Sequence, residues 1–78
     1  MSNVEKLAQV FAETFGISVD QTAGLVYQGI EAWDSVGHMT LVAAIEDSFG
    51  IMLDTDDIID MSSFEKAQEI LKKYNVEF

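Results

Sequence analysis

The 78-residue chain contains no cysteine, no proline and no arginine. Without cysteine it cannot form disulfides, thiolate zinc sites or a protein thiol nucleophile. Its apolar runs are only a few residues long, far shorter than a membrane-spanning helix requires. Glu5 and Gln9 also interrupt the N-terminal stretch where the apolar part of a signal peptide would lie. We therefore expect a cytoplasmic protein with no membrane span.

Basic residues are also scarce, since four lysines face 14 Asp and Glu and give a formal net charge of −10. All four lie towards the ends of the chain, at Lys6, Lys66, Lys72 and Lys73, so residues 7–65 contain 11 acids and no Lys or Arg. Phosphate backbones and anionic membranes require clustered Lys and Arg, and neither is an expected partner. The acidity either maintains solubility or steers basic protein partners into place.

Hydrophobic residues make up 49 % of the chain, which excludes a disordered acidic tail. The length fits one domain over residues 1–78. Ser2 and Glu5 have the spacing of a capping box, and Gly16 is suited to end the helix that they begin. The expected apolar face of this first helix comprises Val4, Leu7, Ala8, Phe11 and Phe15.

Three further helices are predicted. The second begins at Asp34, a favourable N-cap, and ends at Gly50. A short third helix begins at Asp54 or Thr55.

The last helix opens with Ser62 and Glu65, which again have capping-box spacing. Its apolar stripe comprises Phe64, Ala67, Ile70, Leu71 and Tyr74. None of these segments alternates like a strand. The sequence therefore predicts an all-α four-helix bundle with a short third helix and a long loop between helices one and two.

That loop has 17 residues between Gly16 and Asp34, and loops of this length are usually functional or disordered. Its large apolar side chains argue for a loop that folds back over the bundle: Leu25, Val26, Tyr27, Ile30 and Trp33. Trp33 directly precedes the second helix, so we expect it to fix the direction in which the chain enters that helix.

The second helix carries two apolar stripes, although one is enough to face a core. The larger, predicted to face inward, comprises His38, Leu41, Val42, Ile45 and Phe49. The smaller comprises Val36, Met39 and Ala43, with Asp47 further along it and Glu46 to one side. The smaller stripe is predicted to be an exposed contact patch edged with carboxylates. The alternative is a helix more buried than average.

The segment Trp33–Met39, Trp-Asp-Ser-Val-Gly-His-Met, resembles the Asp-Ser-Leu motif of acyl carrier proteins. The resemblance extends over the whole chain, through its length, its acidity, its order of helices and the Phe-Gly-Ile end of the second helix. In that family the serine bears a 4′-phosphopantetheine arm, which holds a biosynthetic intermediate as a thioester. The resemblance implies that Ser35 is the attachment site. It also implies that Asp34 helps to bind metal and to orient the serine during transfer of the arm from coenzyme A.

The same resemblance implies a non-catalytic, monomeric protein without a specific metal site of its own. Its partners would be a phosphopantetheinyl transferase and acyl-loading and acyl-transferring enzymes with basic docking surfaces. The implied partner-binding residues are Val36, Met39, Ala43, Glu46 and Asp47. The implied lining of a cargo pocket comprises His38, Leu41, Val42 and Ile45.

Trp33 and the Gly37–His38 pair after the motif resemble specialised stand-alone carriers, and the chain departs from fatty-acid-type carriers at three positions. Val36 replaces the usual Leu, while Gly37 and Thr40 stand where those carriers commonly have acids. The resemblance places His38, a polar group, beside the space where an acyl chain could shelter, and Tyr27 and Trp33 would narrow that space. We therefore expect a short or polar cargo rather than a long fatty acyl chain.

Three other interpretations stay open. Ser35 and His38 have i, i+3 spacing, but a hydrolase would also need an orienting acid and an oxyanion site. The cluster of Asp54, Asp56, Asp57 and Asp60 resembles a calcium loop only in charge, because the central Gly and the closing Glu are missing. Finally, the chain could be an acidic helical adaptor that binds basic partners without any arm.

Overall fold

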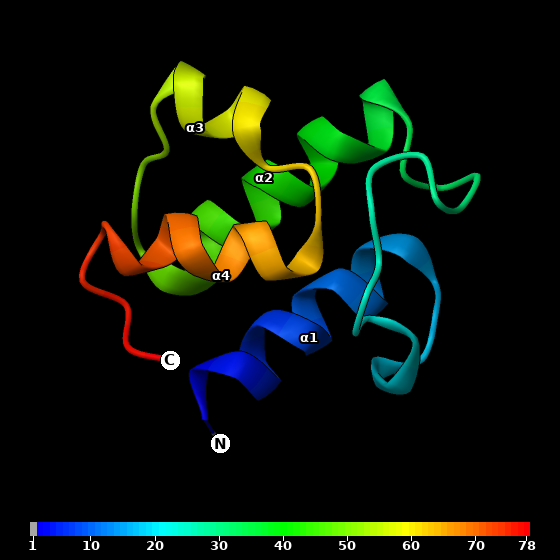
Figure 1. Cartoon of the computed structure of the whole chain (residues 1–78), viewed down its shortest axis with the longest axis horizontal. Coiled ribbons are helices and arrows are strands. Elements are labelled where there is room, and N and C mark those ends of the chain that lie inside the picture. Colours follow the sequence, from blue (N-terminus) through cyan, green and yellow to red (C-terminus); the bar gives the residue numbers. More distant parts are fainter. Residues whose placement is uncertain (1) are drawn as a thin grey trace.

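The computed structural model describes residues 2–78, and these form the all-α fold that the sequence predicts (Figure 1). The elements are α1 (Asn3–Phe15), a 3₁₀ turn η1 (Val19–Gln21), α2 (Ser35–Phe49), α3 (Thr55–Asp60) and α4 (Phe64–Lys72). Helices α1 and α2 pack against each other, and the short α3 lies above α4 in Figure 1. No helix within residues 2–78 is long and apolar enough to cross a bilayer.

Local capping explains where α1 and α2 begin and end. Ser2 and Glu5 form the predicted capping box, in which the Glu5 N–H donates to Ser2 Oγ at 3.3 Å. Asp34 is the N-cap of α2, as predicted. Gly16 and Gly50 end the two helices in the left-handed conformation, with φ of 69° and 65°. Glycine adopts this conformation without the steric cost that a Cβ would impose.

Helix α4 begins one residue later than the capping-box pattern predicts. Its N-cap is Ser63, whose Oγ accepts the Lys66 N–H at 2.9 Å, and the prediction of Ser62 is wrong. The Ser62 carbonyl instead accepts the Tyr27 N–H at 2.8 Å. This long-range bond keeps Ser62 outside the helix. Tyr74 lies beyond the end of α4 and is half-buried.

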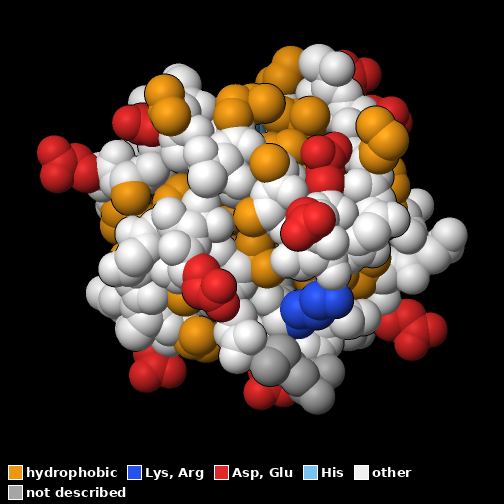
Figure 2. All heavy atoms as spheres, turned by 180° about the vertical axis from the view of Figure 1, so that it is seen from behind, with side chains coloured by type: hydrophobic (Ala, Val, Ile, Leu, Met, Phe, Trp, Pro, Cys, Tyr) orange, Lys and Arg blue, Asp and Glu red, His pale blue; other side chains and the backbone are white. Residues whose placement is uncertain are grey.

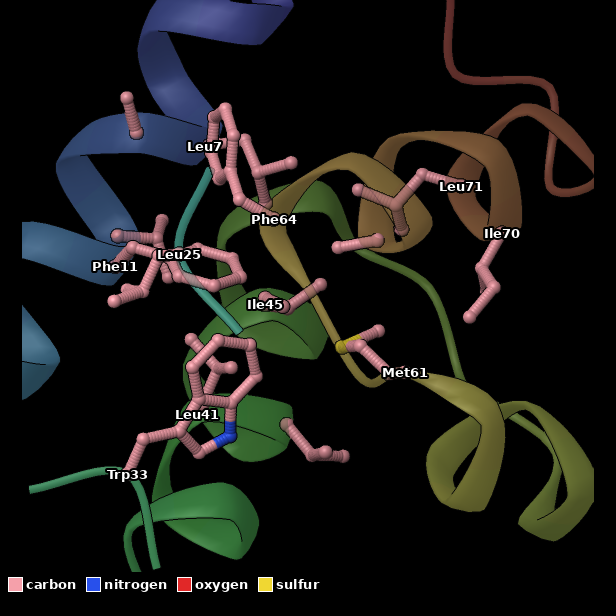
Figure 3. Close-up of a cluster of buried hydrophobic side chains, with 14 of the residues drawn as sticks. Leu7, Phe11, Leu25, Trp33, Leu41, Ile45, Met61, Phe64, Ile70 and Leu71 are labelled. Carbon is pink, nitrogen blue, oxygen red and sulfur yellow. The ribbon is translucent and has the colours of Figure 1, made fainter. Parts of the chain in front are cut away.

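The core is built around aromatic side chains from three parts of the chain (Figure 3). The Phe11 ring meets the rings of Trp33 and Phe64 edge to face, with centroids 5.4 and 5.1 Å apart. Trp33 also stacks on Phe15 at 5.3 Å and is completely buried. The predicted faces of α1 and α4 are buried apart from Val4, which is 38 % exposed, and Tyr74, which is half-buried.

The long loop folds back over the bundle because its backbone pairs with the α3–α4 connection. Val26 and Ser63 form an isolated antiparallel bridge, and the Phe64 N–H donates to the Leu25 carbonyl at 2.9 Å. Leu25 and Trp33 are buried, as expected for the loop, and Tyr27 is half-buried. Val26 is an exception, since the bridge turns it outward and leaves it half exposed.

Candidate functional site

Ser35 is the first residue of α2, and its side chain is exposed. The carboxylate of Asp34 accepts the Gly37 N–H at 2.8 Å and so satisfies one of the free amides of the first turn. The remaining amides and the helix dipole favour an anion at this end of the helix. A phosphoester on Ser35 would therefore lie in a favourable electrostatic setting.

Gly37 allows the loop to lie directly against this first turn. A Cβ at position 37 would lie only 1.9 Å from the carbonyl oxygen of Ala32. Gly37 is therefore a point of close backbone approach. Its lack of a side chain helps to set the position of Trp33 and Asp34.

Tyr27 is the side-chain neighbour of Ser35, and the two hydroxyl oxygens lie 3.2 Å apart. The Val26–Ser63 bridge positions Tyr27, because its N–H is bonded to the Ser62 carbonyl at 2.8 Å. The sequence placed Tyr27 over the bundle but did not predict this contact. No short-range sequence pattern could have predicted it, because the Val26–Ser63 bridge joins a segment before α2 to a segment after α3.

His38 links the loop, α2 and α3 through its two ring nitrogens. The indole N–H of Trp33 donates to His38 Nδ1 at 2.9 Å. Because an indole can only donate, Nδ1 carries no proton and the proton of the neutral ring lies on Nε2. Nε2 then donates to the Ile58 carbonyl at 2.7 Å. This carbonyl belongs to the last turn of α3, where helical acceptors lack partners within the helix.

These contacts leave His38 unsuited to be the base of a serine nucleophile. Both ring nitrogens are committed to groups other than Ser35, whose hydroxyl faces Tyr27 instead. The i, i+3 spacing of Ser35 and His38 thus reflects two separate contacts. The geometry gives no support to the hydrolase interpretation.

A cavity of about 410 Å³ opens between the start of α2 and α3. Its lining residues are Tyr27, Ser35, His38, Met39, Ile58, Ile59, Met61 and Ser62. Only His38 of the four predicted pocket residues is among them. Leu41, Val42 and Ile45 face inward as predicted, but they are buried in the core and do not line this cavity. The sequence did not lead us to predict that α3 forms one wall of this cavity. The adjacent apolar residues Ile58 and Ile59 could have indicated it.

The smaller apolar stripe of α2 is exposed, as the helical wheel predicts. Val36 and Met39 are 76 % and 56 % exposed, and Ala43 and Asp47 are exposed as well. Ile59 of α3 adds a further exposed apolar side chain. Figure 2 shows hydrophobic side chains gathered along the upper edge, where α2 and α3 lie in Figure 1, with acidic groups around them.

Glu46 differs from the other predicted partner-binding residues because it has an internal role. It is half-buried, and its Oε2 accepts the Leu53 N–H at 2.8 Å. This bond holds the segment that connects α2 to α3. Glu46 therefore supports the fold as well as contributing negative charge.

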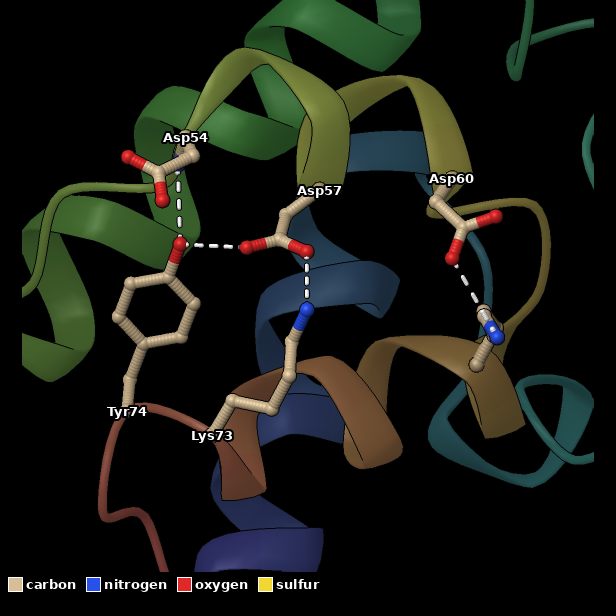
Figure 4. A network of polar contacts seen from close by, with 6 residues as sticks. Asp54, Asp57, Asp60, Lys73 and Tyr74 are labelled. Carbon is tan, nitrogen blue, oxygen red and sulfur yellow. Dashed lines mark hydrogen bonds and ion pairs between the residues drawn. The ribbon is translucent and has the colours of Figure 1, made fainter.

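Two aspartates of α3, Asp57 and Asp60, are engaged with α4 and the residues just after it (Figure 4). Asp57 accepts hydrogen bonds from Lys73 and, at 2.6 Å, from the Tyr74 hydroxyl. Both bonds stabilise the carboxylate and hold the pKa of Asp57 below its usual range. Asp60 pairs with Lys66 at 3.3 Å. Over residues 2–78 there is no group of three or more side chains arranged to hold a metal ion.

Two of the four lysines are engaged in these ion pairs. Lys66 and Lys73 pair with aspartates, and Lys6 lies 4.8 Å from the centre of the Phe49 ring. Beside Ser35, Val36 and Met39 form an exposed apolar patch on a chain whose formal net charge is −10. Such a surface is complementary to a basic partner.

Comparisons of the chain with protein-family models, with curated protein sequences and with solved structures gave no match. What the site does must therefore be argued from its own residues.

Proposed function

We propose that this protein is an acyl carrier, in which a 4′-phosphopantetheine arm on Ser35 holds a biosynthetic intermediate as a thioester. The observation that carries the proposal is the position of Ser35. Its exposed hydroxyl lies at the N-terminus of α2 and on the rim of an apolar cavity. A covalent arm attached there could either extend to a partner enzyme or fold back into the cavity.

The residues around Ser35 fit such an arm. The helix N-terminus favours the phosphodiester, and Tyr27 brings a hydroxyl within hydrogen-bonding distance of the serine oxygen. Asp34 orients the first turn through its bond to Gly37. The arm would supply the thiol that the cysteine-free chain lacks.

The surface fits a protein that visits several enzymes in turn. A carrier must find each partner quickly and leave it quickly. Long-range attraction between the acidic carrier and basic partners speeds encounter, and a small apolar patch such as Val36 with Met39 avoids tight binding. We propose a phosphopantetheinyl transferase and acyl-loading and acyl-transferring enzymes as these partners.

The test is incubation with coenzyme A and a broad-specificity phosphopantetheinyl transferase, followed by intact mass measurement. The chain should gain one phosphopantetheine group. Ser35→Ala should gain none, whereas the matched control Ser62→Ala, which changes an exposed serine on the same cavity, should gain one. A thiol reagent should then label the loaded protein once and the unloaded protein not at all.

Two outcomes would contradict the proposal. Modification that persists in Ser35→Ala would move the attachment site elsewhere. No modification of the folded wild-type chain would favour the alternative, an acidic adaptor that binds basic partners without an arm.

A further inference from the structure

We infer that the Tyr27 phenol binds the phosphodiester of the loaded arm, by moving its hydrogen bond from Ser35 Oγ to a phosphate oxygen. This inference rests on the proposed function and deepens it, because it names a residue outside the Trp33–Met39 motif that would hold the prosthetic group. The observation that carries it is the contact between the Tyr27 and Ser35 hydroxyls, whose oxygens lie 3.2 Å apart.

The phenol is held in place through its backbone and through its ring. The Tyr27 N–H donates to the Ser62 carbonyl at 2.8 Å. The ring packs edge to face against Trp33 and His38, with centroids 6.2 and 5.5 Å apart. Those two rings are joined to each other by a hydrogen bond of 2.9 Å, and Trp33 is completely buried. The phenol oxygen is therefore fixed, whereas Ser35 is exposed and can be modified.

Loading changes what Ser35 offers to this phenol. Transfer from coenzyme A breaks its pyrophosphate bond, forms the Oγ–P bond, releases adenosine 3′,5′-bisphosphate and removes the proton of the serine hydroxyl. The esterified Oγ can no longer donate, and the charged oxygens on the adjacent phosphorus are better acceptors. A neutral phenol can donate to one of them, and hydroxyl bonds to anionic oxygens are among the stronger hydrogen bonds. Rotation of the modified Ser35 side chain is enough to make this bond, because Tyr27 already lies against Oγ.

Neighbouring groups leave this role to Tyr27. Among residues 2–78, Ser35 is the single hydrogen-bond partner of the phenol. The nitrogens of His38 are committed to Trp33 and to the Ile58 carbonyl. Residues 7–65 contain no Lys or Arg, so neither α2 nor the loop before it supplies a cation. The neutral phenol is therefore the donor that this part of the chain offers to a phosphate.

The test uses phosphoserine incorporated at position 35 by an expanded genetic code, so that it does not depend on any transferase. This phosphomonoester shares the Oγ–P bond and the anionic oxygens of the loaded arm. Phosphorus NMR follows its second ionisation, which ordinarily has a pKa of about 6. A hydroxyl that donates to the dianion favours it and lowers this pKa. Tyr27→Phe should therefore raise the phosphate pKa by about 0.5.

The comparison isolates the phenol. Asp34 and His38 are the titratable neighbours on α2 and its cap, and they are the same in both proteins. The matched control is Ser62→Ala, which removes a hydroxyl from the same cavity that is not bonded to Ser35 and should leave the phosphate pKa unchanged. Equal phosphate pKa values with and without Tyr27→Phe, in two folded proteins, would overturn the inference.

A second measurement needs no substitution at Tyr27. The chain has two tyrosines, and a ¹³C label at the ζ carbon reports on both. In the protein with phosphoserine at position 35, the Tyr27 resonance should shift with the ionisation of the phosphate. The Tyr74 resonance should stay in place over the same range, because its hydroxyl is bonded to Asp57. A Tyr27 resonance that ignores the phosphate would overturn the inference even if Tyr27→Phe fails to fold.

The carrier function and this inference can fail separately. If the wild-type chain accepts no arm from coenzyme A, the carrier function fails, while the phosphoserine titration still decides whether Tyr27 binds a phosphate on Ser35. If the arm is accepted but neither measurement detects the contact, the carrier function stands and the inference is wrong.

Discussion

The phenol oxygen of Tyr27 lies 3.2 Å from the hydroxyl oxygen of Ser35, although the two residues belong to different segments of the fold. Tyr27 sits in a loop that the Val26–Ser63 bridge fixes to the α3–α4 connection. Ser35 sits on α2, at the end of the helix that favours an anion. The contact restricts the rotation of the serine side chain before any modification.

We predict that Tyr27→Phe slows arm transfer without weakening the fold. The phenyl ring keeps its packing against Trp33 and His38 but loses the hydrogen bond to Ser35. The kcat/KM of a phosphopantetheinyl transferase for the variant should fall about 2- to 10-fold, the range expected for one hydrogen bond. Tyr74→Phe is the matched control and should leave the transfer rate unchanged. Equal rates for Tyr27→Phe and the wild type would show that the contact does not position the serine.

Gly37→Ala should destabilise the protein even though alanine is the better helix former. The added Cβ would overlap the Ala32 carbonyl, which is backbone and cannot rotate away. We expect a loss of about 1–3 kcal/mol in the free energy of unfolding, typical of overpacking, measured by urea denaturation. Thr40→Ala, on the exposed part of the same helix, should be nearly neutral. A Gly37→Ala variant as stable as the wild type would mean that the loop can shift at no cost.

Substitutions on the exposed stripe of α2 should change partner binding in two distinct ways. Met39→Ala should raise the off-rate of the transferase complex, because it removes apolar contact. Asp47→Lys should lower the on-rate and reduce its dependence on salt, because it weakens long-range attraction. Surface plasmon resonance at two salt concentrations measures both. Unchanged rates for both folded variants would exclude this stripe as the docking surface.

Glu46 should behave differently from Asp47 because of its bond to the Leu53 N–H. Glu46→Ala should lower the melting temperature as well as the on-rate. Glu46→Gln keeps an acceptor oxygen and should lower mainly the on-rate. Thermal denaturation beside the binding kinetics separates the two roles, and equal melting temperatures for all three proteins would mean that the bond contributes nothing to stability.

The contacts of Asp57 predict how stability depends on pH. Its pKa is lowered by the bonds from Lys73 and Tyr74, so its contribution is complete above the ordinary Asp pKa of about 3.9 and is lost as the pH falls through the folded-state pKa. Its carboxylate in turn raises the pKa of Lys73 and of Tyr74. Their contributions are complete below about pH 10 and are lost at higher pH.

We therefore expect Asp57→Asn to unfold more readily than the wild type at neutral pH. The difference in unfolding free energy should shrink at both ends of the pH range. Urea denaturation between about pH 2.5 and 11 measures it. Asp56→Asn, which removes an exposed charge from the same helix, is the control and should show a much smaller difference. A difference independent of pH would rule out ionisation as the source of the effect.

Cations should stabilise the fold by reducing repulsion among its acids. Residues 7–65 hold 11 acids and no Lys or Arg, and self-repulsion disfavours a compact state. Millimolar magnesium or calcium should raise the melting temperature, and sodium chloride should do so at higher concentration through screening. A melting temperature that stays flat across both titrations would contradict this expectation.

The sequence alone determined the helical class, most helix boundaries and the position of Ser35. The ends of α1 and α2 follow from Ser2, Asp34, Gly16 and Gly50 because capping bonds join residues within a few positions of one another. The two stripes of α2 follow from helical period. The prediction for α4 missed by one residue where a long-range bond held Ser62 outside the helix.

The surroundings of Ser35 were decided by tertiary structure. The loop reaches Ser35 through Tyr27 only because the bridge pairs it with a segment some 37 residues later, between Val26 and Ser63. His38 becomes a wall of the cavity because it lies between Trp33 and Ile58, which come from the loop and from α3. Periodicity shows which face of a helix is apolar, but it does not show which neighbours cover that face. For that reason Leu41 and Ile45 could be predicted to face inward, whereas packing decided that they belong to the closed core and not to the cavity.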